Sequence, residues 1–246
     1  MDLICKNCGN TFQGKYCNQC GQKVIAGRLS LGEFFHKFIH SFTHVDKGLL
    51  LLAKELFIRP GIVAREYIEG KRAKYFNPLQ YLILLVAVST FLTLNYDLLG
   101  PKNLQGMLNS ADPQVRFSAG MSNFFYKYFN LVLFATVPVV AFFSWLMFRK
   151  SGFNFAENLV FVSFISAQRT LFFILISPIL YFTKNYWYIS IGLYYLFWIV
   201  YFTYAYIQFY RQGKLLTVIK YIGVFLLSFL IIQSVAMGFV YLFMLK

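Results

Sequence analysis

Charged side chains are scarce in this sequence, and acidic ones are the scarcest. Only 13% of its 246 residues are charged, and just 9 are Asp or Glu. A soluble domain usually carries about 25% charged residues, whereas a bilayer removes the need for them. Apolar residues make up 59% of the chain, with 30 Phe and 18 Tyr. This composition excludes an ordinary soluble protein and predicts a membrane protein.

Residues that support catalysis are also few. The chain holds 3 His and 4 Cys, all before residue 45 and outside every long apolar stretch. It has no GxxxxGK[ST] phosphate loop and no HExxH motif. An intramembrane Ser–His or metalloprotease arrangement therefore has no candidate residues. We expect no enzymatic activity, and no cleavable signal peptide, because MDLICKNC lacks a basic leader and an apolar run.

Long apolar stretches dominate the chain after residue 76. Crossing a hydrocarbon core of about 30 Å takes roughly 20 apolar residues. Asn77 and Pro78 are suited to cap and begin the first helix. The sequence predicts an all-α integral membrane protein with a transmembrane bundle over residues 77–246. Its five expected spans are about 79–99, 128–148, 157–182, 186–209 and 218–245.

The distribution of Lys and Arg predicts the orientation. With a cytosolic N-terminus, inside segments carry 17 basic residues and outside segments carry 5. This asymmetry follows the positive-inside rule. We expect insertion in the bacterial inner membrane with the N-terminus in the cytosol. A third span split in two is the main alternative, and it would return the C-terminus to the cytosol.

All four cysteines belong to one duplicated motif in residues 1–24. Cys5 and Cys8 form the first CxxC pair, and Cys17 and Cys20 form the second, each followed by glycine. Four thiolates at this spacing suit the tetrahedral shell of structural zinc. A reducing cytosol disfavours disulfides, which leaves iron or redox chemistry as the weaker alternatives. The motif predicts a zinc ribbon with structural zinc as its cofactor.

Nucleic acid is a poor candidate partner for this ribbon. Its basic residues are Lys6, Lys15 and Lys23, and its aromatics are Phe12 and Tyr16. So few cations and rings make a small footprint for a nucleic-acid binder. A module that docks an unknown protein partner is the better interpretation.

The segment 29–76 begins with an amphipathic pattern. Apolar positions alternate at spacings of four and three from Leu31 to Leu56, which is typical of a helix at a membrane surface or on the cytosolic end of a bundle. His36, His40 and His44 share the opposite strip, where imidazoles four apart can chelate a metal. Nearby lysines would repel a cation, so we interpret the strip as a solvated face and keep a second metal site, or a pH-sensitive surface, as alternatives.

A basic hinge completes this segment. Pro60 and Gly61 break the preceding helix, and cations then gather just before the first span. Each cation near an anionic membrane surface contributes about 1 kcal/mol of attraction. The cluster predicts a positive-inside anchor, with a site for lipid headgroups or a docked partner as the functional alternative. Its members are Arg59, Arg65, Lys71, Arg72 and Lys74.

Motifs from both halves of this region occur in a fixed order. CxNCG and YCxxCGQ are followed by HVDKG, and then by RPG, REYIEGKR and a Y…P…YL ending. This order resembles a bacterial family of polytopic membrane proteins that carries only the label of a domain of unknown function. Five spans behind a cytosolic N-terminus also resemble Yip1-like membrane proteins at the level of architecture. Neither resemblance implies an activity or catalytic residues.

One arginine lies within the third expected span. Arg169 follows Glu157 by 12 residues, about 18 Å along a helix and close to mid-membrane. An intramembrane charge is energetically costly and suggests a functional site, although it can also stabilise the bundle through hydrogen bonds between helices. Glu157 is too far along the helix to neutralise it, so polar residues of spans three to five are the expected neighbours. The candidate intramembrane polar residues are Arg169, Gln168, Glu157, Tyr201, Gln208 and Gln233.

Two functional interpretations follow from these features. The first is a non-enzymatic membrane adaptor or assembly factor that docks partners through its zinc ribbon. The second is a carrier or lipid-binding protein whose ligand meets Arg169 and the tyrosines of the fourth span. Membrane lipids, with anionic headgroups, are expected partners in both.

Overall fold

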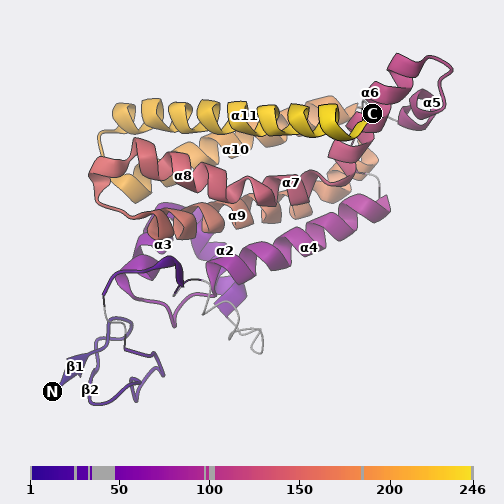
Figure 1. Cartoon of the computed structure of the whole chain (residues 1–246). Coiled ribbons are helices and arrows are strands. Elements are labelled where there is room, and N and C mark those ends of the chain that lie inside the picture. Colours follow the sequence, from indigo (N-terminus) through magenta and orange to yellow (C-terminus); the bar gives the residue numbers. More distant parts are fainter. Residues whose placement is uncertain are drawn as a thin grey trace.

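A computed structural model describes residues 2–24, 27–32, 34, 48–96, 98–99, 103–183 and 186–244 (Figure 1). The N-terminal strands β1 (Leu3–Ile4) and β2 (Thr11–Phe12) pair antiparallel. Helices follow in the described part of the chain: α2 (Gly48–Ile58), α3 (Pro60–Glu69), α4 (Pro78–Tyr96), α5 (Leu104–Leu108), α6 (Pro113–Lys127), α7 (Phe129–Ala135), α8 (Val137–Met147), the 3-10 turn η1 (Arg149–Ser151), α9 (Phe155–Phe182), α10 (Trp187–Tyr210) and α11 (Lys214–Met244).

Five helical segments of the described chain are long and apolar enough to cross a membrane. The structure therefore confirms a mainly helical chain with five candidate spans behind a cysteine-rich N-terminus. The segments are Pro78–Tyr96, Phe129–Met147, Phe155–Phe182, Tyr188–Tyr210 and Lys214–Val235.

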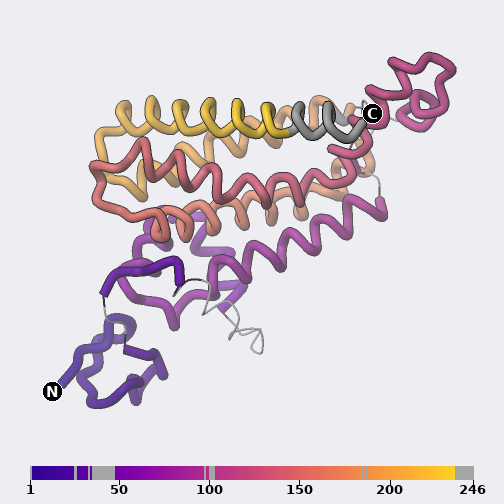
Figure 2. Tube along the Cα trace, viewed as in Figure 1, coloured from indigo at the N-terminus to yellow at the C-terminus, as the bar shows by residue number. Residues whose placement is uncertain are grey.

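Helix α9 is the central helix of the bundle. It packs against α2, α3, α4, α8 and α10, and Figure 2 traces it between α4 and the layer formed by α8 and α11. Its first turn is fixed by a capping box, in which Asn154 and Glu157 each accept the other's backbone N–H. Although Pro178 lies inside it, α9 continues to Phe182. The alternative of a split third span is therefore not what the structure has.

Caps and prolines set the limits of two other spans. The Asn77 side chain accepts the backbone N–H of Leu79 at 2.9 Å, and Pro78 takes the first helical position of α4, as the sequence predicts. The second span is divided into α7 and α8 at Thr136. Pro138 explains this division, because it has no N–H to continue the helical hydrogen bonds.

Helices α2 and α3 form a hairpin that packs along the flank of α9 and α10. The ring of Phe57 lies 5.2 Å from that of Phe172, which is about 25 Å along α9 from its first residue. At the bend, Gly61 permits the closest approach: a Cβ there would lie 2.5 Å from the backbone of Ala205 and Phe209. Leu52 and Leu56, two apolar positions of the predicted amphipathic segment, are buried against the bundle, whereas residues 35–47 of that segment lie outside the described residues.

Contacts place the ribbon and several loops at one end of the bundle. Arg28 donates to the Gly152 carbonyl at 2.6 Å, and Arg65 donates to the Phe209 carbonyl at 2.9 Å. The ends of α8 and α10 and the start of α9 therefore lie beside the N-terminal region (Figure 1). These are the segments for which the charge distribution predicts one common side of the membrane.

Candidate functional site

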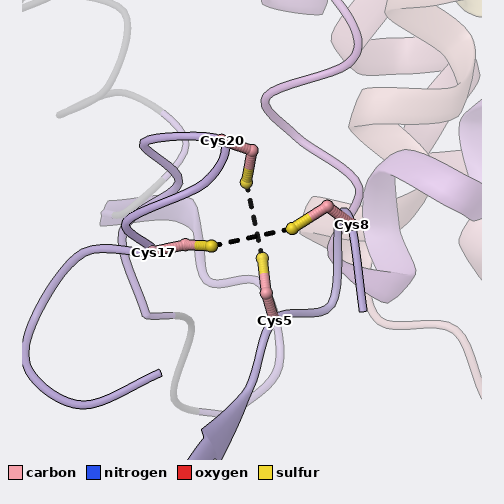
Figure 3. Close-up of side chains that lie close together, drawn as sticks. All are labelled: Cys5, Cys8, Cys17 and Cys20. Atoms are coloured by element: carbon pink, nitrogen blue, oxygen red, sulfur yellow. Dashed lines mark hydrogen bonds between the residues drawn. The ribbon is translucent and has the colours of Figure 1, made fainter. Parts of the chain in front are cut away.

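The four cysteine side chains converge on one point. Their sulfur atoms all lie within 4.8 Å of one another, and Figure 3 shows them directed toward a shared centre. Cys5 and Cys20 are 3.5 Å apart at sulfur, and Cys8 and Cys17 are 3.6 Å apart. A disulfide would require about 2.05 Å. The thiols are free, and their arrangement is compatible with a metal site.

Two backbone turns of the same design position these sulfurs. In the first, Gly9 donates to the Cys5 carbonyl at 2.9 Å; in the second, Gly21 donates to the Cys17 carbonyl at 2.9 Å. Both glycines have positive φ, 77° and 69°, which other residues adopt at a cost. The chain therefore builds one knuckle twice, and each knuckle presents two thiols to the centre.

Backbone N–H groups favour the thiolate form at two of the four cysteines. At Cys8 a backbone hydrogen bond from Asn10 would lower the pKa, but burial and hydrogen bonds with the other thiols raise that pKa. Burial alone would raise the pKa of Cys17, but N–H groups of Cys20 and Gln19 lower that pKa to about 6. The N–H of Gln22 likewise lowers the pKa of Cys20. A tetrahedral ion with bonds of about 2.3 Å needs sulfurs about 3.8 Å apart, close to the observed spacing. The four residues fit a closed metal site with no position left for a substrate.

The ribbon is fastened to the loop before α4 by one side chain. Gln22 is buried, and its amide donates to the Gly70 carbonyl at 2.7 Å. Its side-chain oxygen accepts the backbone N–H groups of Arg72 at 3.0 Å and Ala73 at 2.9 Å. The backbone carbonyl of Gln22 also accepts the Cys17 N–H. Gln22 is therefore bonded both to the second knuckle and to the loop before α4.

A second fastening joins the end of the ribbon segment to α9. Arg28 donates through Nε to Glu157 at 3.1 Å and through a terminal nitrogen at 2.5 Å. The side chain of Glu157 is only 4% exposed. Nearby, Asn154 donates to the Leu29 carbonyl at 3.0 Å. Glu157 thus caps α9 and binds Arg28 at the start of the helix, far from Arg169.

Three of the five hinge cations converge on Glu66. Lys71 lies 3.2 Å, Lys74 3.5 Å and Arg59 3.6 Å from its carboxylate, and Arg59 also pairs with Glu55. Burial would raise the pKa of Glu66, but a hydrogen bond from Tyr75 and the two lysines lower that pKa to about 2. These cations hold the hinge together internally.

The other two hinge cations also contact the protein. Arg65 lies over the Phe153 ring at 5.2 Å in addition to its bond with the α10 carbonyl. Arg72 is buried, and its guanidinium lies 5.9 Å from the ring of Tyr67. A headgroup site at the hinge therefore stays a prediction. Besides the partly exposed Lys71 and Lys74, exposed cations of this end are Arg149, Lys150, Arg211 and Lys214.

Polar residues of α9 and α10 secure the α2–α3 hairpin. Gln168 accepts the Tyr81 hydroxyl at 3.0 Å and donates to the Ala53 carbonyl at 3.2 Å. Tyr201 donates to the Leu56 carbonyl at 2.9 Å, and Gln208 accepts the Gly61 N–H at 3.1 Å. These side chains were expected near Arg169; the structure instead gives each of them a partner on α2, α3 or α4.

Arg169 lines a cavity of about 540 Å³ on the other side of α9. Helices α6, α7, α8, α9, α10 and α11 contribute to its walls, and Gln233 is the only other predicted polar residue among the described lining residues. Arg169 is 3% exposed, and its guanidinium lies 5.2 Å over the ring of Trp198. Its Nε and Nη2 atoms have no hydrogen-bond partner within the described chain.

Some functional residues left a weak signal in the sequence, and some left none. Gln22 follows the second knuckle as Asn10 follows the first, so the repeat could have drawn attention to it. Trp198 is one of only three tryptophans, but nothing in its surroundings predicted contact with Arg169. The candidate histidines His36, His40 and His44 lie outside the described residues.

Comparison with known proteins gives a match for one part of the chain. No curated protein and no solved structure matches it significantly. A family described as "Protein of unknown function (DUF3667)" matches residues 46–90, which contain α2, α3, the hinge and most of α4. The chain is therefore similar to that family over the hairpin and the loop that receives the ribbon.

Proposed function

We propose that this protein is a non-enzymatic integral membrane protein that binds an amphipathic ligand inside its helical bundle, as a carrier or a lipid-handling protein. The observation that carries the proposal is the cavity of about 540 Å³ with Arg169 buried in its wall. This volume lies in the usual range of small-molecule sites. A charge at membrane depth is expensive and typically marks a ligand or ion pathway.

The adaptor role favoured by the sequence has less support from the geometry. The polar contacts described for the ribbon through Gln22 and Arg28 are made with this chain's own loop and with α9. They support a ribbon that stabilises the cytosolic end of the bundle. Docking of another protein stays an expectation of the sequence, and the cavity is the better basis for a function.

Metal identity and membrane placement belong to the same proposal. Zinc suits a closed site of four thiolates better than iron or redox chemistry, because the site offers no open position and needs no electron transfer. Insertion in a bacterial inner membrane with a cytosolic N-terminus is supported by the basic loops that lie at the ribbon's end of the bundle. That compartment would also keep the thiols reduced.

Native mass spectrometry of the full chain in lipid nanodiscs tests the proposal. We expect a retained small amphiphile that is lost when Val224→Phe fills the cavity, since Val224 is a buried lining residue. Val235→Phe on the same helix is the matched control, because Val235 is 68% exposed and lies outside the cavity. Equal retention by both variants, or no amphiphile bound by the wild type when a panel is offered, would overturn the proposal.

A further inference from the structure

The cavity wall holds an unusual group of unsatisfied polar atoms. Among the described residues, four buried side-chain atoms that lack a hydrogen-bond partner belong to its lining: Nε and Nη2 of Arg169, Nε1 of Trp198 and Oγ of Ser228. Most buried polar groups in proteins are hydrogen-bonded, because a buried donor or acceptor without a partner destabilises the folded state. Their concentration at one cavity indicates that a bound molecule supplies the missing partners.

The chemistry of these atoms defines that molecule's polar part. Guanidinium and indole nitrogens donate and cannot accept, so three of the four atoms require an acceptor. Nε and Nη2 form one edge of the guanidinium plane, which matches two oxygens of a carboxylate or phosphate. None of the described lining residues is Asp or Glu, so the lining itself offers no anion to Arg169. An oxyanion would neutralise the charge of Arg169 and accept hydrogen bonds from the unpaired N–H donors.

The remaining wall defines the molecule's apolar part. Phe129, Val140 and Ile191 are half-buried apolar lining residues, while Phe225 and Phe229 are 37% and 49% exposed and form part of the rim. Exposed lining residues place the opening on the outer surface of the bundle, where a hydrocarbon chain can extend into a bilayer. A small soluble anion would leave most of the volume unfilled, so the lining favours a long-chain acid.

We propose that the cavity selects amphiphiles with a carboxylate or phosphate head, held in a bidentate contact at the Nε–Nη2 edge of Arg169, with Trp198 and Ser228 completing its hydrogen bonds. This proposal rests on the proposed function and names its ligand class. The Trp198 ring beneath the Arg169 guanidinium helps to hold its two N–H donors in place through a cation–π contact. No chemical step is involved, because the head is bound and not transformed.

Equilibrium binding to the full-length protein in detergent tests the ligand class. The probes are palmitate, hexadecyl phosphate, hexadecanol and inorganic phosphate. We expect the two long-chain anions to bind at least about 10-fold tighter than hexadecanol, since hydrogen bonds to charged groups contribute about 1.5–3 kcal/mol. Arg169→Gln should weaken palmitate about 10- to 100-fold and leave hexadecanol unchanged, while Arg169→Lys, which keeps the charge without the fork, should be intermediate.

Each other outcome is decisive. Equal binding of palmitate and hexadecanol, unaffected by Arg169→Gln, would overturn the ligand class but leave the proposed function standing. Binding of inorganic phosphate alone would replace a long-chain acid by a soluble anion and overturn the inference. If no amphiphile binds, the proposed function itself fails. Should Arg169→Gln not fold, Trp198→Phe keeps an aromatic side chain and removes the Nε1–H donor, and it must weaken palmitate more than hexadecanol for the inference to hold.

Discussion

The side-chain amide of Gln22 donates to the carbonyl of Gly70 at 2.7 Å and thereby joins the second cysteine knuckle to the loop that leads into α4. These residues are 48 positions apart in the sequence. The contact belongs to a three-bond arrangement that includes the N–H groups of Arg72 and Ala73. Through these hydrogen bonds the ribbon is held against one end of the helical bundle.

Gln22→Leu should release the ribbon from this loop without emptying the metal site. The substitution keeps the side chain's bulk and removes three hydrogen bonds, which should lower stability by about 1–3 kcal/mol. Hydrogen exchange offers a direct measurement, since the amides of Arg72 and Ala73 lose their acceptor and should exchange faster. Gln19→Leu is the matched control, because Gln19 is exposed in the same knuckle. Unchanged exchange at residues 72 and 73 would refute the fastening.

Metal removal should unfold residues 2–24 and loosen the same loop. Cys17→Ser removes one of four ligands, so the metal content should fall from about one ion per chain to near zero. A strong chelator should give the same hydrogen-exchange pattern in the wild type. Gln19→Ser, between the same two ligands, should keep the metal. A ribbon that stays protected without metal would show that its strands and fastenings suffice.

Acid should weaken the hinge through Glu66. Its pKa is lowered from 4.5 in the unfolded chain to about 2 in the folded protein. The folded state therefore binds this proton less readily, so the stabilisation is complete above about pH 4.5 and is lost as the pH falls toward 2. Its size is on the order of 2–3 kcal/mol.

Thermal unfolding between pH 6 and 3 checks this sign. Glu66→Gln should be less stable than the wild type at pH 6, and the difference should shrink as the pH decreases. Glu69→Gln is the control, since Glu69 is exposed on the same helix. A difference that grows on acidification would mean that the cations do not stabilise the Glu66 carboxylate.

Gly61→Ala should separate α3 from α10. The added Cβ would meet backbone atoms at 2.5 Å, and backbone cannot yield as a flexible side chain can. We expect a loss of about 2–4 kcal/mol in stability, together with weaker bonding of Gln208 to the Gly61 N–H. Gly192→Ala on α10 is the control, because nothing lies within 4 Å of its added Cβ. Equal melting temperatures would contradict the close approach.

The sequence predicted those features that arise from local pattern. Apolar runs of sufficient length predicted five spans, and the CxxC pairs predicted a convergent cysteine cluster, because each depends on spacing along one segment. The Asn77–Pro78 start of α4 was also predictable, since a cap acts within one helical turn.

Features that depend on tertiary contacts were not predictable. The hinge cations suggested a membrane surface, yet three of them converge on Glu66, which only the folded hinge brings to them. Tyr201 and Gln208 suggested a lining for Arg169, but helix rotation directs both of them to the hairpin. The cavity itself comes from the mutual placement of six helices, which periodicity does not encode.

The most direct test of the central claim is a high-resolution structure of the full-length protein with a long-chain carboxylate that carries bromine at its far end. We predict that the carboxylate oxygens lie about 3 Å from Nε and Nη2 of Arg169. The bromine should lie near Phe225 and Phe229 at the rim. A cavity filled by protein side chains, or a carboxylate bound away from Arg169, would contradict the account.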